Sequence, residues 1–368
     1  MQRTPRRRVL TPGLAALGVL SLLAACTPPN ERIDPDALGD LSGTLNGAGS
    51  SAQEAAQGAW QAGFQTINPA ATVNYDPVGS GGGREQFVAG GVAFAGSDAF
   101  LSEDEGELEG ARERCGGTPA IEIPNYVSPI AVIYNLEGVE DLRLSPGVLA
   151  GIFNEQIVRW NDPRIARDNP DANLPDARIT PVHRADDSGT TDNFTEYLHE
   201  AGGDAWPHEP DGVWPIKSGE AGQGTAGVVS AVRNGRGTIG YADESQAGGL
   251  DVALIKVGEE YVGPTPEAAA KILEVSERLE GRPEESMVYV LDRATEEAGA
   301  YPVVLTSYLM ACQTYPDQQT ADLVKGYLTY VVSDEGQATS AESAGSAPLS
   351  DAIQETAMDI IEEIAVAP

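Results

Sequence analysis

One seven-residue stretch carries several groups that could bind a ligand: Arg184-Ala185-Asp186-Asp187-Ser188-Gly189-Thr190. It follows a segment typical of a strand, 178–182, and precedes a segment typical of a helix, 191–198. The first turn of a helix has free backbone N–H groups and the positive end of the helix dipole, so it binds anions. The planar guanidinium of Arg184 suits an anion with several oxygens. We therefore predict an oxyanion site here; the alternative is an ordinary helix cap with a solvated arginine.

Three earlier turns have a similar plan, in which a strand ends in a turn rich in glycine and serine. The strands are expected at 42–46, 72–76 and 92–95, and the turns after them are Gly47-Ala48-Gly49-Ser50-Ser51, Gly79-Ser80-Gly81-Gly82-Gly83 and Gly96-Ser97-Asp98-Ala99. Glycine lets the backbone approach a ligand closely. The hydroxyls of Ser51 and Ser80 can donate hydrogen bonds to an anion.

The sequence leaves two alternative roles for each of two acidic residues near these donors. Asp98 follows the expected strand 92–95, where open α/β sheets place their ligands, but a helix cap or turn residue is the alternative. Asp186 stands two residues after Arg184 and is expected either to hold the guanidinium or to be exposed.

The length and charge of the chain limit its class. With 368 residues it can bury a large core and is expected to form two domains or lobes. Its formal net charge of −33 argues against binding nucleic acid, because the phosphate backbone would be repelled. His and Asp do not cluster in a metal-ligand pattern, so we expect no metal and no cofactor.

Two segments match the loose dinucleotide pattern G-x-G-x-x-G/A, and we interpret both as chance matches. The segment 47–52 lacks an acidic residue at the sequence spacing, about 20 residues, at which dinucleotide-binding proteins bind the ribose hydroxyl. Asp76 comes 27 residues after Gly49. The segment 222–227 is expected in a glycine- and serine-rich loop with no strand before it.

The N-terminus has the features of an export signal. Arginines at positions 3, 6, 7 and 8 precede an apolar run, 9–25, which predicts a signal peptide over 1–25. Leu23-Ala24-Ala25-Cys26 resembles a bacterial lipobox, in which the cysteine is lipidated; a plain signal peptide is the alternative. Residues 26–41 are expected to form a flexible tether. The export route, general secretory or twin-arginine, stays open.

With Cys26 assigned to the lipid, Cys115 and Cys312 remain. An even pair in an exported protein predicts a disulfide, and two separate thiols are the alternative.

The four turns, taken in order and spacing, resemble the phosphate-binding lipoproteins of bacterial phosphate-specific ABC importers. Two further motifs fit the same family, Trp160-Asn161-Asp162-Pro163 and Gly237-Thr238-Ile239-Gly240-Tyr241, and the resemblance covers roughly residues 42 to 365. The chain departs at Ser51, where many members have Thr, and at Asp187, which is often Gly. Ser51 keeps the hydroxyl donor, whereas Asp187 adds a negative charge near the site.

The resemblance implies an α/β, two-lobed fold of the periplasmic-binding-protein type (type II), with a hinge and a ligand cleft between the lobes. It implies a first lobe over 42–135 and 302–368 and a second lobe over 136–301. The expected phosphate ligands are Ser51, Ser80, Asp98, Arg184, Ser188, Gly189 and Thr190.

The implied function is high-affinity binding of inorganic phosphate at the cell surface and its delivery to an importer made of a permease and an ATPase. The implied location is the extracytoplasmic face of the membrane, with a lipid anchor. The alternatives are another oxyanion (sulfate, molybdate or an organic phosphate) or a phosphate sensor. A serine hydrolase or phosphatase is disfavoured, because the chain has three histidines and no G-x-S-x-G motif.

Overall fold

The computed structural model describes residues 39–367. The expected signal peptide 1–25, the lipidation site Cys26 and most of the tether 26–41 lie outside the described residues. Within the described part of the chain, no helix has both the length and the apolar character needed to cross a bilayer.

One mixed sheet runs through the described chain. Among residues 39–367, its strands follow the order β2-β1-β3-β14-β4-β8-β6-β7, and β9 also pairs with β4. The β1–β2, β1–β3, β6–β8 and β6–β7 pairs are parallel, whereas β14 and β4 pair antiparallel to each other and to β3 and β8 respectively. The two ends of the sheet are therefore separate parallel units, joined through an antiparallel centre.

The first lobe contains the β2-β1-β3 end of the sheet. Its elements before the centre are β1 (Ser42–Gly49), α1 (Glu54–Ile67), β2 (Ala70–Asp76), α2 (Ser80–Val88), β3 (Phe94–Ser97) and α3 (Glu107–Arg114). The last part of the chain returns to it as β15 (Thr314–Tyr315), α9 (Gln318–Val332), α10 (Asp334–Ala344), α11 (Asp351–Glu362) and β16 (Ala365–Val366). Trp60 and Phe64 lie one helical turn apart on the buried face of α1, and Phe64 packs edge-on against Tyr327 of α9.

The second lobe contains the β8-β6-β7 end. Its strands are β5 (Arg143–Leu144), β6 (Thr180–Arg184), β7 (Glu220–Gly222), β8 (Thr238–Asp243), β9 (Asp251–Val252), β10 (Leu254–Val257) and β11 (Glu260–Val262). Its helices are α4 (Pro146–Phe153), α5 (Pro163–Asp168), α6 (Gly189–Ala201), α7 (Gly224–Asn234) and α8 (Pro266–Val275), with short 3₁₀ turns η2 (Gly203–Ala205) and η3 (Glu244–Gln246). Phe153 of α4 and Phe194 of α6 pack with Tyr241 of β8. Valines of α7 pack in a separate apolar cluster with β4 and β6.

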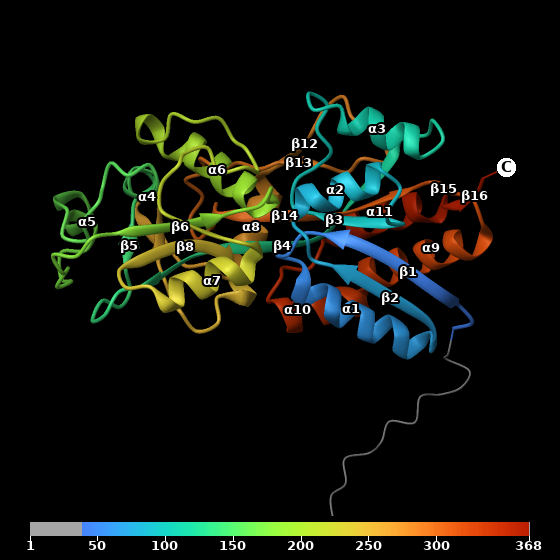
Figure 1. Cartoon of the computed structure of the whole chain (residues 1–368), viewed down its shortest axis with the longest axis horizontal. Helices are drawn as coiled ribbons and strands as arrows, with labels where there is room; N and C mark the ends of the chain where they lie inside the picture. The colour runs from blue at the N-terminus through green and yellow to red at the C-terminus, as the bar shows by residue number, and fades with distance from the viewer. Residues whose placement is uncertain (1–38, 368) are drawn as a thin grey trace, which may run out of the picture. The chain divides into compact units, whose positions relative to one another are not determined.

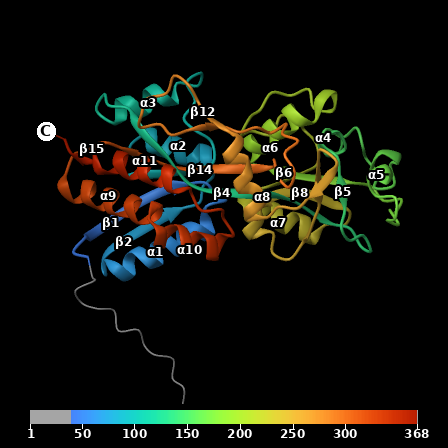
Figure 2. The ribbon, with the colours of Figure 1, turned by 180° about the vertical axis from the view of Figure 1, so that it is seen from behind.

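Two long buried strands connect the lobes, β4 (Ala120–Asn135) and β14 (Val304–Cys312). The first part of β4 pairs with β14, and its last part pairs with β8 of the second lobe. In Figure 1 the blue and red elements lie on one side of these strands and the green and yellow elements on the other; Figure 2 shows the same division from behind. A hinge between the lobes must therefore involve these two strands.

A small hairpin, β12 (Glu277–Arg278) with β13 (Tyr289–Val290), lies within the range 136–301 that the resemblance assigns to the second lobe. Its loop nevertheless contacts first-lobe residues: Arg282 donates to the Leu101 carbonyl (2.7 Å), and the Ser286 hydroxyl donates to Glu122 (2.7 Å). This hairpin therefore packs on the first-lobe side, and the lobe boundaries stay a prediction.

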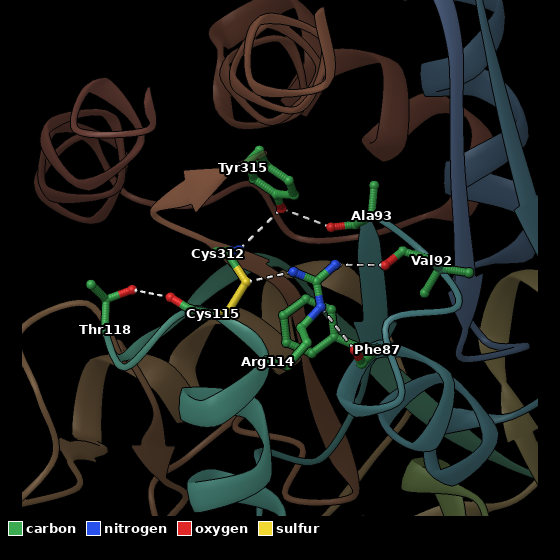
Figure 3. The surroundings of a disulfide bond; sticks show 8 residues. All are labelled: Phe87, Val92, Ala93, Arg114, Cys115, Thr118, Cys312 and Tyr315. Atoms are coloured by element: carbon green, nitrogen blue, oxygen red, sulfur yellow. Dashed lines mark hydrogen bonds between the residues drawn. A yellow bond between two sulfur atoms is a disulfide. The ribbon is translucent and has the colours of Figure 1, made fainter. Parts of the chain in front are cut away.

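A disulfide joins Cys115 to Cys312 at the end of β14, with their Cα atoms 5.3 Å apart (Figure 3). Arg114 lies beside it, donates to the Cys312 sulfur (2.7 Å) and to the Val92 carbonyl (2.9 Å), and stacks on the Phe87 ring. The bridge therefore fastens the end of α3 to a strand that also continues toward the cleft.

The segment 222–227 is not the loop that the sequence predicted. A short strand, β7, precedes it, and it forms the turn into α7. The expectation was wrong because β7 has only three residues, too few to show a periodic pattern.

Candidate functional site

The N-terminus of α6 lies against the first lobe, where the Thr190 hydroxyl donates to Asp98 (3.5 Å). Ser188 is the N-cap, and its hydroxyl accepts from the Thr191 N–H (3.2 Å), so the cap that the sequence offered as an alternative is present. Gly189 and Thr190 are the first two residues of the helix, and N–H groups at these positions have no acceptor within the helix. Ser188 and Thr190 are each 1% exposed. These N–H groups and the helix dipole give a buried site for negative charge.

Arg184 ends β6 beside this helix and is not solvated, since only 3% of it is exposed. Its Nε donates to Asp186 Oδ1 (2.9 Å) and its Nη2 to Asp186 Oδ2 (2.5 Å). Asp186 also accepts from the Gly224 N–H (3.0 Å), so it is fixed from two sides. The expectation that Asp186 holds the guanidinium is confirmed. A charge held in this way needs little reorganisation when it meets a ligand.

Two first-lobe serines face the second lobe. Ser80 is the first residue of α2, after Gly79 in a positive-φ conformation (99°), and its hydroxyl accepts from the Asp98 N–H (3.1 Å). Ser51 follows β1, and its hydroxyl lies 3.0 Å from the Thr225 hydroxyl and accepts from the Thr225 N–H (3.1 Å). The structure thus brings a second helix N-terminus toward that of α6.

The carboxylate of Asp98 receives hydroxyl groups from three elements. Oδ2 accepts from Ser50 (2.5 Å) and from Thr190 of α6 (3.5 Å), and Oδ1 accepts from Ser307 of β14 (2.7 Å). Asp98 caps no helix in the described chain, where the next helix, α3, begins after Gly106. The helix-cap role that the sequence left open is therefore wrong, whereas the ligand role of Asp98 stays a prediction.

The two serine hydroxyls donate to Asp98 and accept from other groups. The Ser50 hydroxyl already accepts from the Ala52 N–H (3.1 Å), and the Ser307 hydroxyl accepts from Gln53 (2.7 Å). An ionised carboxylate can only accept, so the single proton of each serine points to Asp98. Burial raises the pKa of Asp98, whereas the hydrogen bonds from Ser307 and Ser50 and the charge of Arg184 lower it. These donors favour a carboxylate that offers its remaining lone pairs to a ligand proton.

The lobes touch each other closely at this point. A Cβ atom on Gly189 would lie 2.6 Å from the Ser80 hydroxyl and 2.8 Å from Asp98 Cβ, both too short for a real contact. The Gly81 N–H donates to the Asp187 carbonyl (3.3 Å), and Gln246 of η3 donates to the Ser51 carbonyl (2.8 Å). The structure is therefore a closed form in which the N-terminus of α6 lies against Ser80 and Asp98 of the first lobe.

Asp187, the departure from the family pattern, lies beside Gly81 of α2 and lines the same cavity as Asp98. Its carboxylate lies 3.7 Å from Arg84 of α2, and its side chain is 43% exposed. Burial raises the pKa of Asp187, and the charge of Arg84 lowers it. Its charge is therefore partly balanced by Arg84.

Sequence reasoning missed four residues that the fold brings to the site: Ser50, Asn193, Thr225 and Ser307. Thr225 belongs to the glycine-rich segment 222–227, so the sequence did show a hydroxyl in a turn at this position. Ser307 lies in an apolar strand at a register irregularity between Ser307 and Tyr308, and such bulges redirect side chains. No local pattern marks that irregularity in the sequence.

A cavity of about 490 Å³ adjoins the site, and Asp98 is part of its wall. Its other acids include Asp187, Asp192, Glu196 and Asp211, and its arginines are Arg84, Arg282 and Arg293. Burial, together with the charge of Glu196, raises the pKa of Asp192 to about 7. The wall of this cavity is thus rich in acidic side chains, whereas most of the predicted ligands are hydrogen-bond donors.

This fold and site define a two-lobed binding protein with an anion cleft. Residues 34–335 match the family model described as the PBP superfamily domain. The chain is 36% identical over 281 residues to "Phosphate-binding protein PstS 3" of Mycobacterium tuberculosis (strain ATCC 25618 / H37Rv), covering 72% of each chain. It is 32% identical over 332 residues to "Phosphate-binding protein PstS 3" of Mycobacterium leprae (strain TN), covering 85% of this chain and 89% of the relative. The chain belongs to the PstS family of phosphate-binding proteins.

Solved structures agree on the fold. A high-affinity periplasmic phosphate-binding protein (PfluDING) bound with phosphate at pH 8.5 superimposes with a TM-score of 0.69 at 22% identity, covering 85% of this chain and 92% of that one. The expected α/β two-lobed binding-protein fold is confirmed. The relatives are named as binding proteins, so the family places this chain outside the enzymes and gives the hydrolase alternative no support.

Proposed function

We propose that this chain binds inorganic phosphate between its lobes, outside the cytoplasm, and delivers it to an ABC importer consisting of a permease and an ATPase. The proposed ligands are Ser51, Ser80, Asp98, Arg184, Ser188, Gly189 and Thr190. The observation that carries the proposal is the meeting of two helix N-termini, the Arg184–Asp186 pair and one buried acceptor, Asp98, in a closed cleft.

This combination suits phosphate because it offers many donors together with one acceptor. Backbone N–H groups, hydroxyls and a guanidinium can meet the unprotonated oxygens. Near neutral pH phosphate keeps a P–OH, which can donate to Asp98. The family name of the relatives supports the same ligand. Delivery to the importer and the extracytoplasmic location rest on the same family relation and on the export signal in residues 1–25.

Calorimetric titration of phosphate into the wild type and Arg184→Ala tests the proposal. We expect the variant to lose phosphate affinity by a factor of about 100 or more, because a charge-assisted pair is removed and Asp186 is left as an unpaired buried acid. The matched control is Arg159→Ala, which removes an exposed arginine of the second lobe that pairs with Asp176. A wild type that binds no phosphate, or an Arg184→Ala variant that binds as well as Arg159→Ala, would contradict the proposal.

A further inference from the structure

Asn193 of α6 makes a hydrogen-bonded link between the lobes directly behind the site. It lies one turn after Gly189 and is 6% exposed. Its amide N–H groups donate to the Gly189 carbonyl (2.8 Å) and, across the cleft, to the Asp98 carbonyl (2.6 Å). Asn193 therefore holds the backbone of the same first-lobe residue whose carboxylate faces the site.

Arg293 fixes the orientation of the Asn193 amide. Its Nη2 donates to Asn193 Oδ1, and because a guanidinium accepts no hydrogen bonds, the amide oxygen must face it. The NH₂ end of Asn193 is then directed to Asp98. Because its neighbours fix the orientation of the Asn193 amide, the side chain loses little conformational entropy when it forms its hydrogen bonds.

Arg293 also joins α6 to the crossover strand. It donates to Glu196 through Nε (3.0 Å) and Nη2 (2.7 Å), and its Nη1 donates to the Pro302 (3.3 Å) and Val304 (2.5 Å) carbonyls at the start of β14. The Arg293 side chain is fully buried. All of its N–H groups are used, so it connects α6 rigidly to the strand on which the lobes must turn.

We propose that Asn193 is a closure latch: a positioning residue that stabilises the closed form through its bond to the Asp98 carbonyl. When the lobes separate, the bonds of Asn193 to Gly189 and Arg293 stay within α6 and its support, whereas the bond to Asp98 breaks. Asn193 does not reach the ligand through its side chain, because both ends of its amide are already occupied. The proposal rests on the proposed function in one respect, that phosphate is the ligand whose release the latch slows.

The test is Asn193→Leu, which keeps the side-chain size and removes both donors. The rates of phosphate binding and release are measured by chase of radiolabelled phosphate, and the open fraction by small-angle X-ray scattering with and without phosphate. We expect release to become about tenfold faster with little change in the binding rate, because the latch forms after the encounter and leaves the Asp98 carbonyl unpaired when lost. Scattering should show more of the open form.

Asn169→Leu is the matched control. Asn169 is also 6% exposed, its amide donates to the Arg143 (2.7 Å) and Ile165 (2.9 Å) carbonyls, and its oxygen accepts from the Arg143 N–H (2.8 Å), all within the second lobe. A general loss of stability should appear in both variants, but faster release only in Asn193→Leu. Equal release rates in the two variants, with the same open fraction, would overturn the latch while leaving phosphate binding intact. If the wild type binds no phosphate, the proposed function fails, and the ligand-free scattering of the two variants still decides the latch.

Discussion

At the scale of single residues, Asp98 is the group in the proposed site that should determine the selectivity among oxyanions. A carboxylate repels an anion unless the anion brings a proton. Ser50 and Ser307 direct their protons at Asp98, so its free lone pairs must be met by a donor from the ligand. Phosphate near neutral pH has one, and sulfate has none.

We therefore predict that Asp98→Asn lowers the preference for phosphate over sulfate by roughly ten- to hundredfold, since an unsatisfied buried acceptor costs about 1–3 kcal/mol. The amide can donate to a sulfate oxygen, which the carboxylate cannot do. Calorimetric titration of both anions into wild type and variant measures the ratio. An unchanged ratio would remove Asp98 from the selectivity mechanism.

Asp192 in the first turn of α6 should make stability depend on pH. Burial and the charges of Glu196 and Asp211 raise its folded-state pKa to about 7, against the opposing charges of Arg84 and Arg293. The folded chain then holds a proton that the unfolded chain has released, so this carboxyl lowers stability as pH rises from about 4 to about 7.

Asp192→Asn should remove this contribution. We expect the variant to melt about 1–3 °C above the wild type at pH 8 and at nearly the same temperature at pH 4. Thermal unfolding of both proteins across this range is the measurement, and the difference between them cancels the many other acids. A difference that does not grow with pH would show that the carboxylate is not penalised in the fold.

At the scale of elements, the bridge between Cys115 and Cys312 ties α3 to β14. The enclosed loop is long, because the cysteines are 197 positions apart, so chain-entropy reasoning gives an upper value of about 5 kcal/mol for its stabilisation. β14 also carries Ser307, which donates to Asp98. Loss of the bridge should therefore loosen the first lobe more than the second.

We predict that replacing both cysteines by serine lowers the free energy of unfolding by about 2–5 kcal/mol. Urea unfolding followed by fluorescence measures this change, and reductant should bring the wild type to the same midpoint while leaving the variant unaffected. Thiol labelling of the unfolded, unreduced protein provides an independent check. Two reactive thiols in addition to Cys26 would be incompatible with the bridge.

At the scale of the whole molecule, we predict that the position of the protein in the cell depends on Cys26, which lies outside the described residues. A bacterial lipobox would attach lipid there, and two lipid chains anchor a protein stably, whereas one binds only marginally. We predict that Cys26→Ala moves the protein from the membrane fraction to the soluble fraction. Fractionation at high salt is the measurement, because salt removes electrostatic attachment; a variant that stays with the membrane would contradict the anchor.

The charge of the whole chain also sets a condition on binding. With a formal net charge of −33, the molecule repels an approaching anion at long range. Affinity must come from groups in direct contact with the ligand, because screening by salt limits the long-range field to about 10 Å. The two helix N-termini and Arg184 are the buried groups that we propose for such contacts.

The sequence by itself determined the local parts of this protein. Glycine-serine turns after short apolar strands predicted the N-termini of α2 and α6, since caps and turns depend on neighbouring residues. The spacing of Asp186 from Arg184 also allowed the ion pair to be expected, because the partners are only two positions apart. The family resemblance then gave the order of the lobes.

Only the tertiary structure decided which distant side chains share the site. Ser307 reaches Asp98 across 209 positions, and Thr225 reaches Ser51 across 174, through an antiparallel centre that no local pattern encodes. In the sequence, nothing distinguishes Asn193 from other polar residues of an amphipathic helix. Its hydrogen bond to the Asp98 carbonyl exists only in the folded, closed structure. Local propensity acts over a few residues, whereas these contacts depend on strand order and lobe closure, which are set by burial of the whole core.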